Sequence, residues 1–172
     1  RSFLCIDWNA LRKNRNKRYQ KNTNINSSNI KNLKLKWSFR LKGWDARSQP
    51  IAIGNLILVA TKDTLYALDS DTGCAFWSFK SPSGFRVSPA YGKEAGPFLF
   101  AVDQELITYK LDLLEGKLVW KTQLPRESEW NLSSGSISIT NSHLIIPIST
   151  VETIAPLNPM YECCTTSGGI AK

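Results

Sequence analysis

The sequence predicts an all-β chain that forms part of a β-propeller, with about two and a half four-stranded blades. Residues 67–77 read Ala-Leu-Asp-Ser-Asp-Thr-Gly-Cys-Ala-Phe-Trp, where one strand ends in an Asp/Gly turn and the next strand brings in a Trp. A weaker copy of this string occupies residues 111–120, and Trp37 lies one further step upstream. A period of roughly 40–45 residues with several short strands per unit is typical of propeller blades.

Each part of the repeated string has a physical role in the turn. The carboxylate of Asp69 can accept backbone amides two residues on, and Gly73 supplies a conformation that a Cβ disfavours. The Trp that returns at a fixed distance can pack over the turn, with its indole N–H seeking an acceptor. We expect Trp37, Trp77 and Trp120 each to join one sheet to its neighbour in a radial fan. A lone hairpin is the alternative reading, and two copies in register argue against it.

Apolar runs between turn residues mark the expected strands. In chain order these are residues 33–41, 51–53, 56–60, 64–68, 76–79, 86–91, 98–102, 106–111, 118–122, 136–140 and 144–148. The strictly alternating run 33–41 predicts a half-buried strand with Leu, Trp and Phe on its inner face. We divide the chain into a basic lead-in strap (1–32), two blades (33–80 and 81–124) and a partial blade with the Cys-Cys segment (125–172). A ring needs roughly four to eight blades. We therefore expect the isolated chain to be the N-terminal portion of a propeller, marginally stable and prone to self-associate.

The net charge of +8 is unevenly distributed. Residues 1–47 hold 13 Lys and Arg against Asp7 and Asp45, and the run at 12–19 is the densest. This asymmetry raises the hypothesis of a polyanion partner such as nucleic acid. The same stretch is rich in Asn and Lys throughout, which favours a solvated strap, so we expect no nucleic-acid partner. No apolar run approaches the ~20 residues of a membrane span.

The number and spacing of the four cysteines limit which metal and redox sites this segment can form. There is no Cys-x-x-Cys and His143 is the single His, which weakens a zinc site and excludes covalent c-type haem from this segment. Cys5 and Cys74 are expected to be single, buried or partly buried thiols. Cys163 and Cys164 are adjacent, so they either form a strained, easily reduced bridge or remain two free thiols. Chemistry alone favours the free thiols.

These residues carry a resemblance to a known family. The string at 67–77 resembles the tryptophan-docking motif of the propellers of pyrroloquinoline quinone (PQQ) dehydrogenases, and is most similar to the polyvinyl-alcohol-dehydrogenase-like branch. The segments at 16–37 and 46–50, and the stretch from 73 to Arg86, are similar to that family's lead-in and first blade. Residues 161–165, Tyr-Glu-Cys-Cys-Thr, look like its vicinal-cysteine segment. The resemblance covers nearly the whole chain.

The resemblance implies an eight-bladed propeller that oxidises alcohols in the periplasm or outside the cell. It also implies PQQ in a central funnel, beside Ca²⁺ and stacked on a vicinal disulfide. On this analogy Cys163 and Cys164 form the platform, Arg86 and Arg47 reach the carboxylate or quinone oxygens, and Glu152 faces the funnel. Either Arg could instead be a salt-bridge partner at a blade edge.

The same resemblance places the catalytic Asp and the Ca²⁺ ligands in later blades. We therefore expect this segment to hold no catalytic residue and no metal, and to turn over nothing alone. Alcohol and an electron acceptor would be partners of the complete parent. Ser167 stands where the family usually has an Arg, which weakens the expected cofactor site. The alternative function is a non-catalytic propeller scaffold that binds other proteins.

Overall fold

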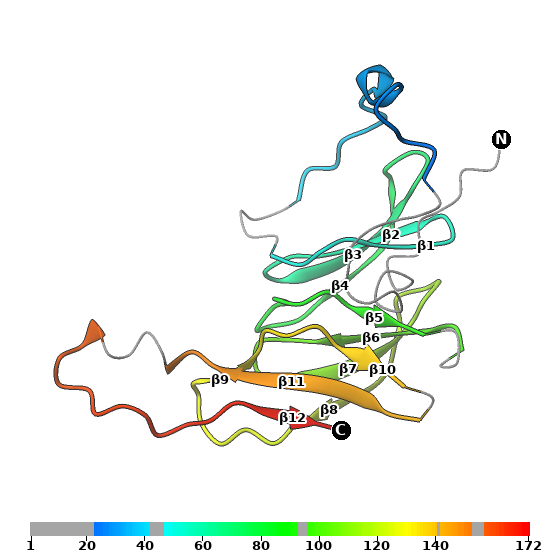
Figure 1. Ribbon diagram of the computed structural model, residues 1–172. Helices are drawn as coiled ribbons and strands as arrows, with labels where there is room; N and C mark the ends of the chain where they lie inside the picture. The colour runs from blue at the N-terminus through cyan, green and yellow to red at the C-terminus, as the bar shows by residue number, and fades with distance from the viewer. Residues whose placement is uncertain (1–22, 42–46, 93–95, 141, 153–156) are drawn as a thin grey trace.

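The structure is a computed structural model that describes residues 23–41, 47–92, 96–140, 142–152 and 157–172 (Figure 1). Apart from the short 3-10 helix η1 (Ile30–Asn32), the regular elements in these residues are β-strands. They form three antiparallel sheets of four strands each. The expected all-β, partial propeller fold is therefore confirmed. Cys5 and the basic run at 12–19 lie outside the described residues.

The first two sheets are simple meanders in which consecutive strands are neighbours. The first contains β1 (Ile51–Ile53), β2 (Leu56–Ala60), β3 (Thr64–Asp69) and β4 (Ala75–Lys80). The second contains β5 (Ala90–Tyr91), β6 (Phe98–Val102), β7 (Ile107–Asp112) and β8 (Leu118–Gln123). Both have a register shift where the last two strands pair, at Ala67/Leu68 and at Lys110/Leu111. The matching irregularity shows that the two sheets are structural repeats of one unit.

The third sheet repeats the first three strand positions and adds a strand that sequence reasoning missed. Its order is β10 (Ser138–Ile139), β11 (Leu144–Thr150) and β12 (Gly169–Ala171). The missed strand β9 (Asn131–Ser133) pairs with residues 148–150 of β11. Only three residues long and interrupted by polar side chains, β9 has no apolar pattern that would have marked it.

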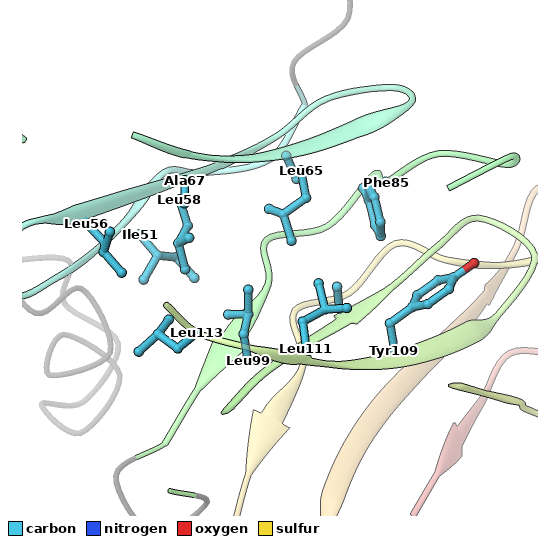
Figure 2. Packing of buried hydrophobic residues seen from close by; sticks show 12 residues of the cluster. Ile51, Leu56, Leu58, Leu65, Ala67, Phe85, Leu99, Tyr109, Leu111 and Leu113 are labelled. Atoms are coloured by element: carbon cyan, nitrogen blue, oxygen red, sulfur yellow. The ribbon is translucent and has the colours of Figure 1, made fainter. Parts of the chain in front are cut away.

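The first sheet lies above the second and third in the view of Figure 1. Apolar side chains form one cluster between the first and second sheets and another between the second and third. Between the first two sheets, leucines of β2 and β3 point toward leucines of β6 and β7 (Figure 2). Leu58, Leu65, Leu99 and Leu111 are completely buried there. A second, smaller cluster joins the second sheet to the third and includes Val102 and Ile146. The second sheet thus buries both of its faces, as an inner blade of a propeller does.

Two tryptophans each bond to the turn of a sheet further along the chain. The indole N–H of Trp77, on β4, donates to the carbonyl of Leu113 in the turn after β7, at 3.1 Å. Trp37 does the same to Ser70 in the turn after β3, at 3.0 Å. The sequence suggested that a Trp packs over the turn preceding it; instead each packs over the turn one unit downstream. The expectation that these residues join neighbouring sheets is confirmed for Trp77, whereas Trp37 ties the segment before β1 to the first sheet.

Trp120 and the run 33–41 differ from expectation. Trp120 is 38% exposed, and within the described residues its indole makes no hydrogen bond, so its joining role remains a prediction. The run 33–41 is not a strand, and Leu35 in it is 85% exposed. Trp37 and Phe39 are half-buried as the alternation requires. Alternation reports which side chains face the protein, but a strand also needs a hydrogen-bonding neighbour, and no described segment pairs with this one.

Candidate functional site

All the predicted site residues belong to segments at one end of the sheets. In an antiparallel meander, the segment entering the first strand and the link between the second and third strands lie at the same end. Arg47 precedes β1, and Arg86 precedes β5. Glu152, Cys163 and Cys164 lie in the long link between β11 and β12. We call this end of the sheets the loop end.

Hydrogen bonds tie the loop-end segments of neighbouring sheets together. The Gln49 amide donates to the hydroxyl of Ser88 at 2.9 Å, and that hydroxyl donates to the Gln49 carbonyl at 2.8 Å. The amide of Phe85 donates to the carbonyl of Thr61, in the link between β2 and β3. The loop end is therefore one connected surface across the first two sheets.

The two arginines occupy equivalent positions on this surface. Arg47 is two residues before Gln49, and Arg86 is two residues before Ser88, the residues that bond to each other. Arg47 is exposed and Arg86 is half-buried. Among the described residues Arg86 makes no ion pair with a carboxylate.

Cys163 and Cys164 form a disulfide, with their Cα atoms 3.1 Å apart and a cis peptide bond between them. Both residues are exposed. The alternative of two free thiols is therefore wrong in this structure. Cys74 is free, as expected, but it is exposed and not buried. It follows the Asp/Gly turn at the start of an outer strand, where the turn keeps it at the surface.

Glu152 is completely buried, and its carboxylate is saturated with hydrogen bonds from the disulfide loop. Oε1 accepts from the Tyr161 hydroxyl and from both the amide and the hydroxyl of Thr165. Oε2 accepts from the amide of Thr166 at 2.7 Å and from its hydroxyl. These donors lie on both sides of the cysteine pair. The carboxylate thus binds the loop itself, a role that the sequence did not reveal because the partners carry no motif.

These contacts fix the charge of Glu152. Burial raises the pKa of the carboxyl, but the hydrogen bonds from Thr166, Tyr161 and the amide of Thr165 outweigh it and bring the pKa to about 2. In return, the bond to Glu152 raises the pKa of the Tyr161 hydroxyl. Near neutral pH the pair is therefore a carboxylate and a neutral phenol, which is the charge-assisted arrangement.

Further contacts hold the same loop against the third sheet. The side-chain amide of Asn131, on β9, donates to the Ser167 carbonyl at 3.0 Å. The hydroxyls of Thr150 and Thr166 lie 2.7 Å apart, and the Thr150 hydroxyl also accepts the Glu152 amide. Asn131 is buried. The disulfide is thus exposed to solvent while the residues on either side of it are fastened to the protein.

Two kinds of site are not seen among the described residues. These residues contain no group of three or more His, Cys, Asp and Glu side chains that could hold a metal ion. They also contain no helix with the length and apolar character needed to cross a membrane.

Known proteins resemble this chain in sequence over most of its length. Residues 8–93 match the PQQ family model, described as the glucose/ethanol/alcohol dehydrogenase beta-propeller domain, and this match spans half of the chain. The chain belongs to this family. A polyvinylalcohol dehydrogenase from Sphingopyxis sp. (strain 113P3) is 32% identical to it over 162 residues, covering 90% of this chain and 24% of that protein. A lanthanide-dependent methanol dehydrogenase from Methylorubrum extorquens is 28% identical, covering 78% of this chain and 24% of that protein.

Solved structures support the same PQQ-family fold. The quinohemoprotein alcohol dehydrogenase from Comamonas testosteroni superposes with a TM-score of 0.67 at 19% identity, covering 75% of this chain and 21% of that one. At this identity the likeness concerns the fold. The chain spans about a quarter of the length of the curated relatives it matches.

Proposed function

We propose that this chain supplies the disulfide platform and the first blades of a PQQ-dependent alcohol dehydrogenase, and that it does not oxidise alcohols by itself. Membership of the PQQ propeller family supports the parent activity. The chain spans about a quarter of its relatives, so the remaining residues of such a site would come from further blades. The observation that carries the proposal is the exposed Cys163–Cys164 disulfide at the loop end.

The residues at the loop end fit one side of a PQQ site. PQQ is flat and carries carboxylates, so it needs an apolar face to stack on and cations to pair with. The exposed disulfide offers such a face, and Arg47 and Arg86 offer guanidinium groups, which match carboxylates in geometry. Ser167 remains a departure, because it offers a hydroxyl where the family usually has an Arg.

The chemistry divides between the cofactor and the protein. When bound, PQQ would supply the two-electron acceptor for alcohol oxidation, with Ca²⁺ held by residues of further blades. The residues of this chain would bind and orient it: the disulfide from one face, the arginines at the carboxylates. An external electron acceptor would then be a partner of the complete protein.

PQQ binding to the full-length gene product tests the proposal. We expect the double variant Cys163→Ser/Cys164→Ser to bind PQQ at least tenfold more weakly, because it loses the apolar stacking face without any change in charge. Equilibrium dialysis measures the affinity, and reduction of a dye with alcohol, PQQ and Ca²⁺ measures the activity. Cys74→Ser, which removes the exposed thiol at the other end of the first sheet, is the matched control and should match wild type.

Two results would contradict the proposal. Unchanged PQQ affinity in the double variant would remove the disulfide from the site. Absence of both PQQ binding and dye reduction in the wild-type protein would favour the non-catalytic scaffold.

We also propose that the chain works in the periplasm or outside the cell, since an exposed disulfide persists in oxidising compartments. Alkylation of cysteines in intact cells, followed by mass spectrometry of the Cys163–Cys164 peptide, tests the location. Recovery of the pair as two alkylated thiols would contradict it.

A further inference from the structure

The carboxylate of Glu152 is completely buried, so it is not part of the exposed surface that carries the disulfide. Every hydrogen bond it accepts comes from Tyr161, Thr165 or Thr166. These residues precede the cysteine pair by two positions and follow it directly. Within the described residues no lysine or arginine pairs with Glu152, and hydrogen bonds from these donors are the contacts seen at its carboxylate.

We propose that Glu152 is a positioning residue that clamps the loop on both sides of Cys163–Cys164 and so favours the disulfide over the dithiol. The clamp would also hold the disulfide in place for stacking on PQQ, and this consequence rests on the proposed function. The effect of Glu152 on the equilibrium between disulfide and dithiol does not depend on the proposed function.

Only a carboxylate satisfies this arrangement of donors. Oε1 receives three hydrogen bonds and Oε2 receives two, all from N–H and O–H groups. An ionised carboxylate accepts at both oxygens, whereas the amide of a glutamine has one accepting oxygen and an NH₂ that only donates. In Glu152→Gln the NH₂ would therefore face either the Tyr161 and Thr165 donors or the two donors of Thr166.

The link to redox equilibrium is thermodynamic. The clamp is seen in the loop with the disulfide formed, so its bonds stabilise that state of the loop. In the dithiol the two cysteines remain neighbours in the chain, and the clamp holds the flanking backbone in the arrangement seen with the bond formed. Weakening the clamp lets the dithiol leave the loop arrangement in which the bond forms, and the disulfide becomes easier to reduce.

The test is a redox titration of the chain in mixtures of reduced and oxidised dithiothreitol, without PQQ. Alkylation and mass spectrometry report the fraction of the Cys163–Cys164 pair reduced, and the exposed thiol of Cys74 serves as an internal reference for alkylation. We expect Glu152→Gln to shift the equilibrium at least tenfold toward the dithiol, which is about 30 mV for a two-electron couple.

The matched control is Glu162→Gln. Glu162 is exposed and directly precedes Cys163, so this variant removes the same charge next to the cysteine pair in the sequence and leaves the clamp residues unchanged. We expect it to titrate within twofold of wild type. Equal shifts in the two variants would overturn the proposal, because they would show an effect of charge alone. A Glu152→Gln titration that coincides with wild type would also overturn it.

A milder variant keeps the test decisive if Glu152→Gln does not fold. Thr166→Val keeps the shape of the side chain but removes the hydroxyl that donates to Oε2. We expect a smaller shift, about threefold, in the same direction, and a titration identical to wild type would count against the clamp.

PQQ binding is measured separately. A redox shift without any PQQ binding would support Glu152 as the clamp and contradict the proposed function. PQQ binding without a redox shift would support the proposed function and contradict the clamp.

Discussion

At the scale of single residues, buried carboxylates of this chain hold neighbouring turns together through hydrogen bonds. Asp103, completely buried in the link between β6 and β7, is the clearest case after Glu152. Its Oδ2 accepts the hydroxyls of Ser81 and Tyr109, both at 2.7 Å, and its Oδ1 accepts the amides of Glu105 and Ile107. Ser81 follows the last strand of the first sheet, so this carboxylate joins two sheets at the loop end.

The tyrosine in this network gives a pH-dependent prediction. Burial, together with the Asp103 carboxylate, raises the pKa of Tyr109 to about 12, against about 10 in an unfolded chain. A raised folded-state pKa contributes stability that is full below about pH 10 and is lost as the pH rises toward 12. We expect the free energy of unfolding to fall across that window in wild type and to fall less in Tyr109→Phe. Urea unfolding at several pH values measures this.

Tyr66→Phe is the control for the loss of a hydroxyl. Tyr66 is also buried, and its hydroxyl makes no hydrogen bond within the described residues. A pH dependence that is the same in wild type and both variants would show that Tyr109 does not carry it.

At the scale of elements, the contact between a tryptophan and the next Asp/Gly turn is the repeated joint of the molecule. Asp69 and Asp112 shape their turns alike: each Oδ1 accepts the amides two and three residues on. Hydrogen bonds from the amides of Thr72 and Asp71 lower the pKa of Asp69. The turn then ends in a glycine that lies under the indole of the preceding unit.

Gly116 tests this joint. It has φ of 68°, and a Cβ added there would lie 2.6 Å from Cε3 of Trp77. Gly116→Ala should therefore lower the free energy of unfolding by about 2–4 kcal/mol, through left-handed backbone strain and overpacking together. Gly54 has a similar φ of 59° but no atom near its Cβ position, so Gly54→Ala should cost only about 1 kcal/mol. Chemical unfolding followed by circular dichroism compares them, and equal losses would mean that the Trp77 contact adds nothing.

The same elements show what the sequence could predict and where it stopped. The turn at Asp69 was predictable because its hydrogen bonds join residues two and three apart, and the residue types that make such turns are few. The destination of Trp77 was not, because a repeat length gives separation along the chain and says nothing of which neighbouring turn is nearer in space. The clamp at Glu152 was out of reach for a similar reason. Its donors lie 9 to 14 residues away, across a link with no periodic pattern.

At the scale of the whole molecule, the described residues bury the layers between sheets but leave apolar side chains on the outer strands. All six residues of β8 are exposed, and Leu118, Val119 and Trp120 follow one another there. On β4 of the first sheet, Phe76 is 53% exposed. β8 lies at the end of its sheet, so it also offers a strand edge together with this apolar surface.

We therefore predict that the isolated chain self-associates through the β8 surface. Val119→Lys places a charge on this edge strand, between Leu118 and Trp120 in the sequence, where desolvation of the ammonium opposes contact between copies, and it should shift the population toward monomer. Leu35→Lys is the matched control: it adds the same charge at a leucine that is 85% exposed but stands alone between two lysines, and it should associate like wild type. Sedimentation velocity at several protein concentrations distinguishes these outcomes. A wild-type chain that stays monomeric and melts in one sharp transition would show that β8 does not mediate self-association in water.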